Sequence, residues 1–150
     1  MSHQPEKVIL TNMCMIYDEN GNVLVQDRKK SWCGIAFPGG HVEPLESIVD
    51  STIREVKEET GLHISDLQFC GVKQWQHNDV RNIVFLFKTD VFTGTLHSTE
   101  EGENFWVNLE NLDSYELAEN FEVMLHVFLD EDISEHYLKN TETGYIDLLK

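Results

Sequence analysis

Short runs of apolar and β-branched residues alternate along the chain with polar turns. Val8–Tyr17 and Asn22–Arg28 are rich in β-formers and predict two strands. Asn20-Gly21, which lies between them, is the strongest short signal for a hairpin turn. A short apolar piece, Ile35–Phe37, leads into Pro38-Gly39-Gly40, and strand-like runs follow near Leu67–Trp75, Asn82–Phe92 and Phe105–Val107.

Two other segments have the periodicity of helices. The first spans about Leu45–Thr60, with Pro44 suited to its first turn and Gly61 to the position after its last residue. The second is predicted at Asn120–Leu129, with Phe121, Met124, Leu125 and Phe128 on one face. The buried stripe expected for the first helix consists of Leu45, Ile48, Val49, Thr52, Ile53 and Val56.

The order strands, helix, strands, helix predicts an α+β fold in which helices pack on a mixed β-sheet. Residues 131–150 have no clear periodicity. No repeat, low-complexity segment or linker interrupts the chain, so we expect residues 1–150 to form a single domain.

The chain is strongly acidic, since 11 Lys and Arg stand against 27 Asp and Glu, a net charge of −16. Such a surface repels phosphate backbones and anionic lipids, which argues against a nucleic-acid polymer or a membrane as partner. An anionic small molecule would need a local positive charge in order to bind, and a divalent metal ion is the usual source.

The cysteines and the first residues bear on the compartment. Cys14, Cys33 and Cys70 are odd in number and far apart, which argues against a disulfide framework or a zinc site. The first ten residues lack the long apolar core of a signal peptide, and no apolar run approaches the roughly 18 residues of a membrane span. We therefore expect a cytoplasmic protein.

Three glutamates near the end of the first predicted helix are poorly placed for stability. Glu55, Glu58 and Glu59 stand at positions i, i+3 and i+4 and share one flank of the helix. Like charges at this spacing repel, and the helix dipole disfavours negative charge in the last turn. A divalent cation would reverse both effects, and carboxylate oxygens suit Mg²⁺ or Mn²⁺. The alternative is a solvated acidic face.

Residues around these glutamates favour the metal site. Arg54 can hold a carboxylate in place, and the Gly39-Gly40 turn lets the backbone approach a ligand closely. Segment 40–62 matches the Nudix box, G-x5-E-x7-R-E-U-x-E-E-x-G-U with U an aliphatic residue, at Gly40, Glu46, Arg54, Glu55, Val56, Glu58, Glu59, Gly61 and Leu62. On these residues the chain resembles the Nudix hydrolases, whose fold is an α/β/α sandwich with a mixed sheet between helices.

The resemblance implies a hydrolase acting on a nucleoside diphosphate linked to another group. Glu55, Glu58 and Glu59 would bind Mg²⁺, or Mn²⁺ in its place, with the help of the Gly39 carbonyl. Arg54 would orient Glu55, and Glu46 would be structural rather than a direct ligand. An acidic residue before the strand at 105–107 would complete the metal site or assist the attacking water, in the order of preference Glu101, Glu103, Glu100.

Within the family the chain looks most like the MutT-type branch, which cleaves (d)NTPs to the monophosphate and pyrophosphate. Its best-known substrate is 8-oxo-dGTP, an oxidised precursor that is removed before polymerases use it, which is a DNA-repair function. By this resemblance Arg28 would contact phosphate and Asn120 would read the purine edge. Gly40 and His41 would lie near phosphate, although some members have a lysine in the place of His41. Arg28 as an ordinary exposed arginine and Asn120 as a plain N-cap residue are the alternatives.

Other substrates and a non-catalytic role are the competing hypotheses. The same chemistry would serve ADP-ribose, a dinucleoside polyphosphate, an ordinary or deaminated NTP, or a capped RNA end. The absence of proline after Gly61 disfavours the ADP-ribose branch. A nucleotide-sensing module would be expected to lose box glutamates, which this chain keeps. Trp32, Trp75 and Phe37 could stack on a base or belong to the core, and both a monomer and a homodimer fit the sequence.

Overall fold

The computed structural model describes residues 3–30 and 32–150. In chain order the elements are strands β1 (Lys7–Ile16), β2 (Asn22–Arg28) and β3 (Gly34–Ala36), helix α1 (Ile48–Thr60), strands β4 (Leu62–Ser65), β5 (Gln68–His77), β6 (Val80–Thr89), β7 (Val91–Gly94) and β8 (Gly102–Asn108), a 3-10 helix (Leu109–Ser114), helix α2 (Phe121–Leu129) and strands β9 (Glu135–Thr141) and β10 (Gly144–Leu149). Within the described ranges no helix is both long and apolar enough to cross a membrane.

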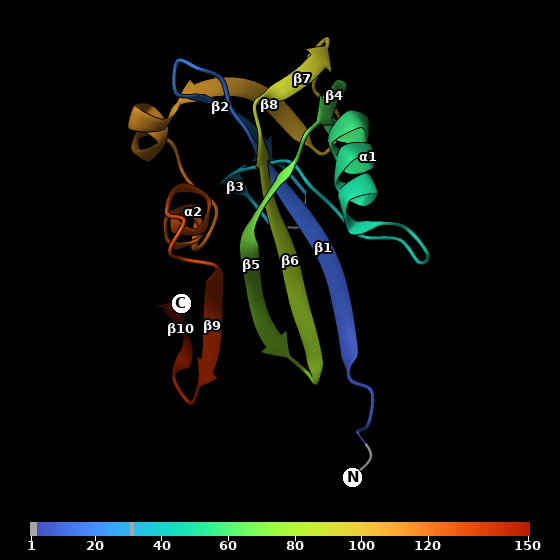
Figure 1. The fold of residues 1–150 in the computed structure, drawn as a ribbon. Helices are drawn as coiled ribbons and strands as arrows, with labels where there is room; N and C mark the ends of the chain where they lie inside the picture. The colour runs from blue at the N-terminus through green and yellow to red at the C-terminus, as the bar shows by residue number, and fades with distance from the viewer. Residues whose placement is uncertain (1–2, 31) are drawn as a thin grey trace.

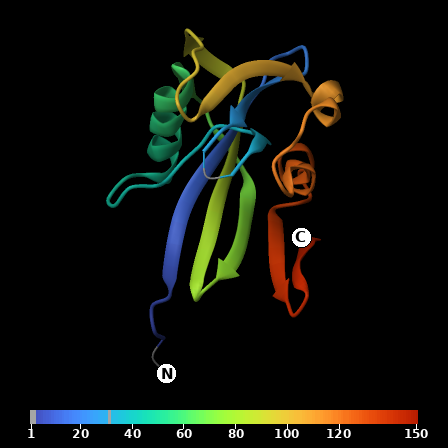
Figure 2. The ribbon, with the colours of Figure 1, turned by 180° about the vertical axis from the view of Figure 1, so that it is seen from behind.

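The strands of the described residues form three sheets. A five-stranded mixed sheet has the order β1-β6-β5-β9-β10, a three-stranded antiparallel sheet has the order β3-β2-β8, and β4 pairs with β7. Helix α1 lies on one side of the large sheet and α2 on the other, as Figures 1 and 2 show from opposite directions. This arrangement confirms the predicted α+β fold, a mixed sheet with helices packed on it.

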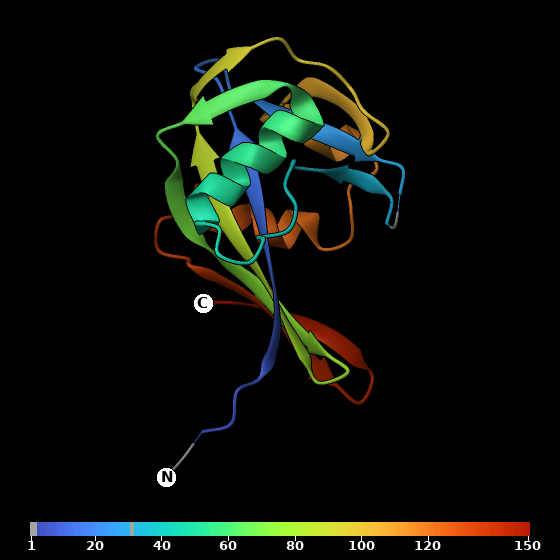
Figure 3. The ribbon, with the colours of Figure 1, turned by 90° about the vertical axis from the view of Figure 1, so that its right-hand side faces the viewer.

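Alternation along the strands buries both faces of the sheets. In β1, Met15 belongs to the core cluster that includes the α2 residues Phe121 and Phe128, whereas Cys14 and Ile16 belong to the cluster that includes Val56 of α1. Because successive side chains of a strand point to opposite faces, one strand supplies both clusters. Figure 3 shows α1 in front of one half of the large sheet, with the β5–β6 hairpin extending beyond it.

Phe37 is a core residue. Its ring lies 4.9 Å from that of Phe121 and 5.2 Å from that of Phe128, and its side chain is 1% exposed. The hypothesis that Phe37 stacks on a base is therefore wrong. Its burial instead fixes the chain just before Pro38-Gly39-Gly40.

The predicted hairpin between the first two strands is wrong, although the turn itself exists. The Asp18 carboxylate accepts the backbone N–H groups of Asn20 and Asn22, and Gly21 has a φ of 81°. Beyond a single bridge, Tyr17 to Val23, the two strands separate. β1 pairs in parallel with β6, and β2 is occupied on its two edges by β3 and β8, so no edge remains for β1.

Helix α1 begins three residues later than predicted. Ser47 is its N-cap, and the Ser47 hydroxyl oxygen accepts the backbone N–H of Asp50. Pro44 therefore lies in a turn before the helix, and Leu45 has a φ of 66° and a fully exposed side chain. Val49 is 41% exposed, so neither Leu45 nor Val49 belongs to the buried stripe. The predicted helix end at Gly61 is confirmed by its φ of 83°.

Two predictions about later strands also change. The strand predicted at 82–92 is divided at Asp90, because β6 ends at Thr89 and β7 leaves to pair with β4. Residues 131–150, which had no clear pattern, contain the β9–β10 hairpin, and β9 joins the large sheet beside β5.

The packing of Phe37 generates a stability prediction. Phe37→Ala should lower the free energy of unfolding by about 3–5 kcal/mol, the usual effect of removing a buried phenylalanine ring, as measured by urea denaturation. Leu129→Ala, in the same α2 neighbourhood but 53% exposed, is the matched control and should cost less than about 1 kcal/mol. Equal losses in both variants would show that Phe37 does not anchor the core.

Candidate functional site

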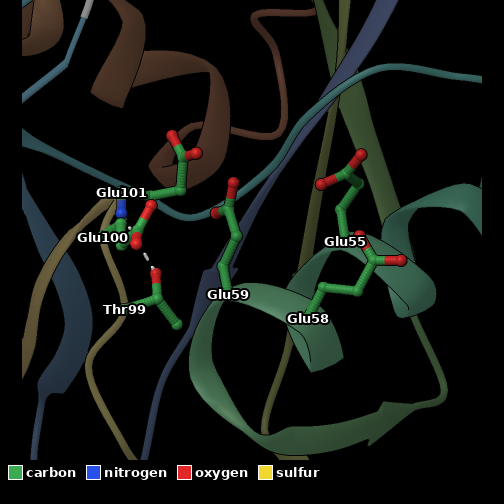
Figure 4. Close-up of a pocket in the computed structure, with 6 residues that line it drawn as sticks. All are labelled: Glu55, Glu58, Glu59, Thr99, Glu100 and Glu101. Atoms are coloured by element: carbon green, nitrogen blue, oxygen red, sulfur yellow. Dashed lines mark hydrogen bonds between the residues drawn. The ribbon is translucent and has the colours of Figure 1, made fainter.

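A cavity of about 320 Å³ lies between helix α1 and the loop before β8. Its lining residues are Glu55, Glu58, Glu59, Thr99, Glu100 and Glu101. Figure 4 shows Glu59 between Glu101 on one side and Glu55 and Glu58 on the other. The fold thus brings together the helix glutamates and two of the three acidic residues predicted to complete their site, Glu100 and Glu101.

Two glycines allow the chain to pass between β1 and α1. The backbone N–H of Asn12 donates to the Gly40 carbonyl (2.8 Å), and that of Cys14 donates to the Pro38 carbonyl (3.0 Å). A Cβ added at Gly39 would overlap the Asn12 carbonyl oxygen, and one at Gly40 would overlap the Glu55 carboxyl group. Glycine is therefore required at position 39 by backbone contact, and at position 40 it leaves the Glu55 carboxyl group in its place.

Asn12 is a buried residue that the sequence reasoning missed. Its side-chain oxygen accepts the Gly40 N–H (3.1 Å), and its amide nitrogen donates to Ser51 Oγ on α1 (2.9 Å). It therefore ties the glycine turn to both β1 and the helix. The available signal was a single amide among the apolar residues of a strand. Because the Gly40 N–H is used here, it is not free to bind a phosphate.

Arg54 connects the helix to the loop that precedes it. Its Nε and Nη2 donate to the two carboxylate oxygens of Glu46 (2.7 and 3.0 Å), and Nη2 also donates to the His41 carbonyl (3.0 Å). Nη1 donates to both Glu55 and Glu58, at 3.2 Å each. These hydrogen bonds lower the pKa of Glu46 and partly neutralise two of the cavity carboxylates.

Glu59 is the most buried of the helix carboxylates, at 8% exposure. Burial raises the pKa of its carboxyl group to about 7, and the negative charges of Glu55 and Glu101 act in the same direction. The Gly39 N–H, which donates to Glu59 Oε2 (3.2 Å), and the positive charge of Arg28 oppose this rise in pKa. Without a cation, a proton on Glu59 partly relieves the repulsion.

The three acidic residues of the segment 99–103 differ in their contacts and in their position relative to the cavity. The Glu101 N–H donates to Thr99 Oγ1 (3.2 Å), and its carbonyl accepts the Lys29 N–H (3.3 Å), which fixes the backbone beside the cavity. Glu100 also lines the cavity, but its side chain is 90% exposed and pairs with Lys30 (3.2 Å). Glu103 lies in β8 opposite Asp27 and does not line the cavity.

The side chains at the cavity fit a divalent cation by their chemistry. They offer only hard oxygen donors, and one of them, Glu59, is a buried carboxylate whose charge lacks full compensation. Among the described residues, no three acidic, histidine or cysteine side chains converge closely enough to form a finished metal cage. Two of the cavity carboxylates, Glu55 and Glu58, are instead paired with Arg54.

Arg28 ends β2, directly between Gly34 of β3 and Gly102 of β8. Its side chain is half-buried, and its guanidinium carbon lies 4.2 Å from the centroid of the exposed Trp32 ring. Its Nε is buried without a hydrogen-bond partner. An ordinary exposed arginine does not have these contacts. Of the other aromatic candidates, Trp75 is half-buried against the core and lies 5.6 Å from Lys73 Nζ.

Asn120 lies away from the glutamates, in a second cavity of about 310 Å³. It has a φ of 65°, and its side chain makes no capping hydrogen bond, so it does not serve as a side-chain N-cap. The backbone N–H of Ala118, in the wall of this cavity, donates to the Ile35 carbonyl (3.0 Å). This hydrogen bond attaches the wall of the cavity to β3. The second cavity is lined by Tyr115, Leu117, Ala118, Glu119, Asn120, Phe121 and Glu122.

The sequence matches a known domain over most of its length. Residues 9–130 match the NUDIX domain. The chain is 32% identical over 111 residues to the uncharacterized Nudix hydrolase YvcI of Bacillus subtilis, covering 70% of this chain and 69% of that protein. It is 50% identical over 38 residues to the putative 8-oxo-dGTP diphosphatase YtkD of the same organism, covering 25% and 24%. An ADP-ribose pyrophosphatase of Methanocaldococcus jannaschii is 32% identical over 102 residues, covering 65% and 60%.

The fold has a solved counterpart. The crystal structure of a MutT protein from Bacillus halodurans superposes with a TM-score of 0.79 over 95% of this chain and 97% of that one, at 20% sequence identity. At this identity the likeness establishes the shared fold.

The buried Glu59 generates a prediction about pH. Its folded-state pKa of about 7 lies above the ordinary 4.5, so as pH rises the unfolded chain releases this proton first. The metal-free protein should therefore lose stability between about pH 4.5 and pH 7, by up to about 3 kcal/mol. Glu59→Gln should remove this loss, so with a chelator present the variant should exceed the wild type in unfolding free energy at pH 8 but not at pH 4.5.

Glu58→Gln is the matched control, because the Glu58 side chain is 58% exposed. It should change the free energy of unfolding by only a few tenths of a kcal/mol at either pH. If Glu59→Gln followed the wild type across the same pH range in urea denaturation, the destabilised carboxylate would be excluded.

Proposed function

This chain belongs to the NUDIX family and is a Nudix hydrolase acting on pyrophosphate bonds; on that premise we propose that it is a Mg²⁺-dependent nucleoside triphosphate pyrophosphohydrolase. The proposed substrate is 8-oxo-dGTP or a related (d)NTP, hydrolysed to the monophosphate and pyrophosphate. In that role it would remove oxidised precursors before DNA synthesis, as a DNA-repair function. Family members act on small nucleotides and generally use divalent metals such as Mg²⁺.

One observation carries this proposal: the three helix glutamates of the box, Glu55, Glu58 and Glu59, line a single cavity together with Glu101. Non-catalytic use of the fold requires none of these carboxylates, and their mutual repulsion makes them costly to keep. Glu55, Glu58, Glu59 and Glu101, with the Gly39 carbonyl, are the proposed holders of Mg²⁺ or Mn²⁺. The bound ion would neutralise the polyphosphate and orient a water for attack on phosphorus.

Several side chains of this protein would position the metal ligands, the attacking water and the substrate phosphates. Arg54 holds Glu55 and Glu58 by hydrogen bonds and keeps them on the cavity side of the helix. Glu101, whose backbone N–H is held by Thr99 on the opposite wall, would either complete the metal site or take a proton from the attacking water. Arg28, at the edge of this cavity, is the proposed phosphate contact. Glu46 holds Arg54 and has no direct part.

The second cavity suits the nucleoside end of a substrate. Strands β8, β2 and β3 and the segment at Ala118 lie side by side, so Glu101 and the Asn120 cavity are separated by about three strand spacings, roughly 14 Å. A ligand with an anionic end and a ring at the other end matches this separation. The Asn120 amide, free of capping, offers a donor and an acceptor to a purine edge. The exposed His41 ring is a further proposed contact near phosphate, whereas the N–H and carbonyl of Gly40 are both hydrogen-bonded to Asn12 and leave no free donor there.

ADP-ribose hydrolysis is the second candidate, favoured by the similarity to an ADP-ribose pyrophosphatase over 65% of this chain. It would use the same glutamates, so the two candidates differ only in the ligand of the second cavity. For either substrate we propose action as a monomer or homodimer in the cytoplasm, where three free cysteines would stay reduced.

A nucleotide panel tests the proposed function. With Mg²⁺, the wild type should release pyrophosphate from 8-oxo-dGTP or dGTP, whereas ADP-ribose would yield two monophosphates. Glu59→Gln should lower kcat by at least about a hundredfold by weakening metal binding. Glu110→Gln, an exposed carboxylate outside the cavity, is the control and should retain wild-type kcat. Full activity of Glu59→Gln, or no hydrolysis of any nucleotide, would refute the proposal.

The proposed role of Asn120 gives a separate prediction. Asn120→Ala should raise KM for 8-oxo-dGTP by about tenfold and for dGTP much less, because the amide hydrogen bonds to the oxidised edge would be lost. Asn140→Ala, an exposed amide in β9, should leave both KM values unchanged. An equal rise in KM for the two nucleotides would remove the base-reading role from Asn120.

A further inference from the structure

Arg28 and Trp32 form a stacked pair beside the glutamate cavity. The Arg28 guanidinium carbon lies 4.2 Å from the centroid of the Trp32 ring, within the range of a cation–π contact. The backbone N–H of Trp32 also donates to the Lys30 carbonyl (2.8 Å). This contact accounts for the position of Trp32, a large apolar side chain that stays 43% exposed.

The contact with Trp32 gives the Arg28 guanidinium no hydrogen-bond acceptor, because the indole ring has only a donor N–H. It therefore leaves the hydrogen bonds of the arginine N–H groups to other partners. Among the described residues, the one hydrogen bond from this side chain joins Nη1 to Gln26 Oε1 at 3.5 Å, and the buried Nε has no partner. The guanidinium therefore keeps donors for an anionic oxygen.

Arg28 lies near the cavity carboxylates without forming an ion pair with them. Arg28 pairs in register with Gly102, the residue after Glu101, and its charge acts on Glu59. No ion pair joins Arg28 to either glutamate within the described part of the chain. A guanidinium without this restraint, in a chain with a net charge of −16, would be drawn to the carboxylates and would compete with a cation for them.

We propose that Trp32 is a positioning residue that holds the Arg28 guanidinium for a substrate phosphate and away from Glu59 and Glu101. The proposal rests on the proposed function, since it requires a polyphosphate substrate at this cavity. Trp32 acts through Arg28 and does not need to touch the substrate.

Three substitutions at position 32 distinguish the effect of an aromatic ring beside Arg28 from the effect of side-chain size. Trp32→Ala and Trp32→Leu both remove the aromatic face, whereas Trp32→Phe keeps it. With dGTP and Mg²⁺, the first two should raise KM about two- to fivefold, the change that a cation–π contact at an exposed site supports, and leave kcat nearly unchanged. Trp32→Phe should restore most of the wild-type KM. Tyr145→Ala, a remote aromatic residue of similar exposure (42%), should change neither constant.

A double-mutant cycle and a binding measurement complete the test. Trp32→Ala added to Arg28→Ala should raise KM no further, because the positioned group is already gone. Calorimetric binding of inorganic tripolyphosphate with Mg²⁺ should follow the same order of variants. Additive effects, or Trp32→Leu equal to wild type, would overturn the role of Trp32. If the wild type hydrolyses no nucleotide, the proposed function fails, while tripolyphosphate binding still decides the role of Trp32.

Discussion

Repulsion among the carboxylates of Glu55, Glu58, Glu59 and Glu101 is the constraint on which the arrangement of this site depends. The fold places them around one cavity and compensates them only in part. Arg54 neutralises two of them, and the Gly39 N–H supports a third. The negative charge that stays uncompensated contributes to the raised pKa of Glu59. Burial of this carboxyl group favours a bound proton when no other positive charge is present. A cavity of this kind is prepared for a ligand that arrives with its metal ion.

The segment 37–40 joins this site to the core. Phe37 packs between the rings of Phe121 and Phe128, and the Pro38 and Gly40 carbonyls accept hydrogen bonds from β1. The same few residues therefore anchor α2 and lie against Glu55. At Gly39 a Cβ would overlap the backbone of Asn12, so the close approach of this segment to β1 is fixed by backbone contact. At Gly40 a Cβ would instead meet the Glu55 carboxyl group, so this glycine leaves room for the first helix glutamate.

The features that the sequence predicted well are those set by local spacing. The glutamates at i, i+3 and i+4 and the glycine after the helix follow from helix geometry, and the structure has both. The β1–β2 hairpin failed because pairing depends on which edges other strands occupy, and β2 is taken by β3 and β8. The predicted helix start near Leu45 failed because Ser47 caps the helix, which begins at Ile48. Asn12 and the Trp32–Arg28 stack are contacts between separate segments, which spacing along the chain does not reveal.

The central claim is that these carboxylates together hold a divalent cation. Titration of Mn²⁺ into the nucleotide-free protein, followed by electron paramagnetic resonance of the free ion, tests it without reference to any substrate. The account predicts saturable binding that Glu59→Gln weakens by at least about tenfold and that Glu110→Gln, outside the cavity, leaves unchanged. Binding of Mn²⁺ with equal affinity by the wild type and both variants would contradict it.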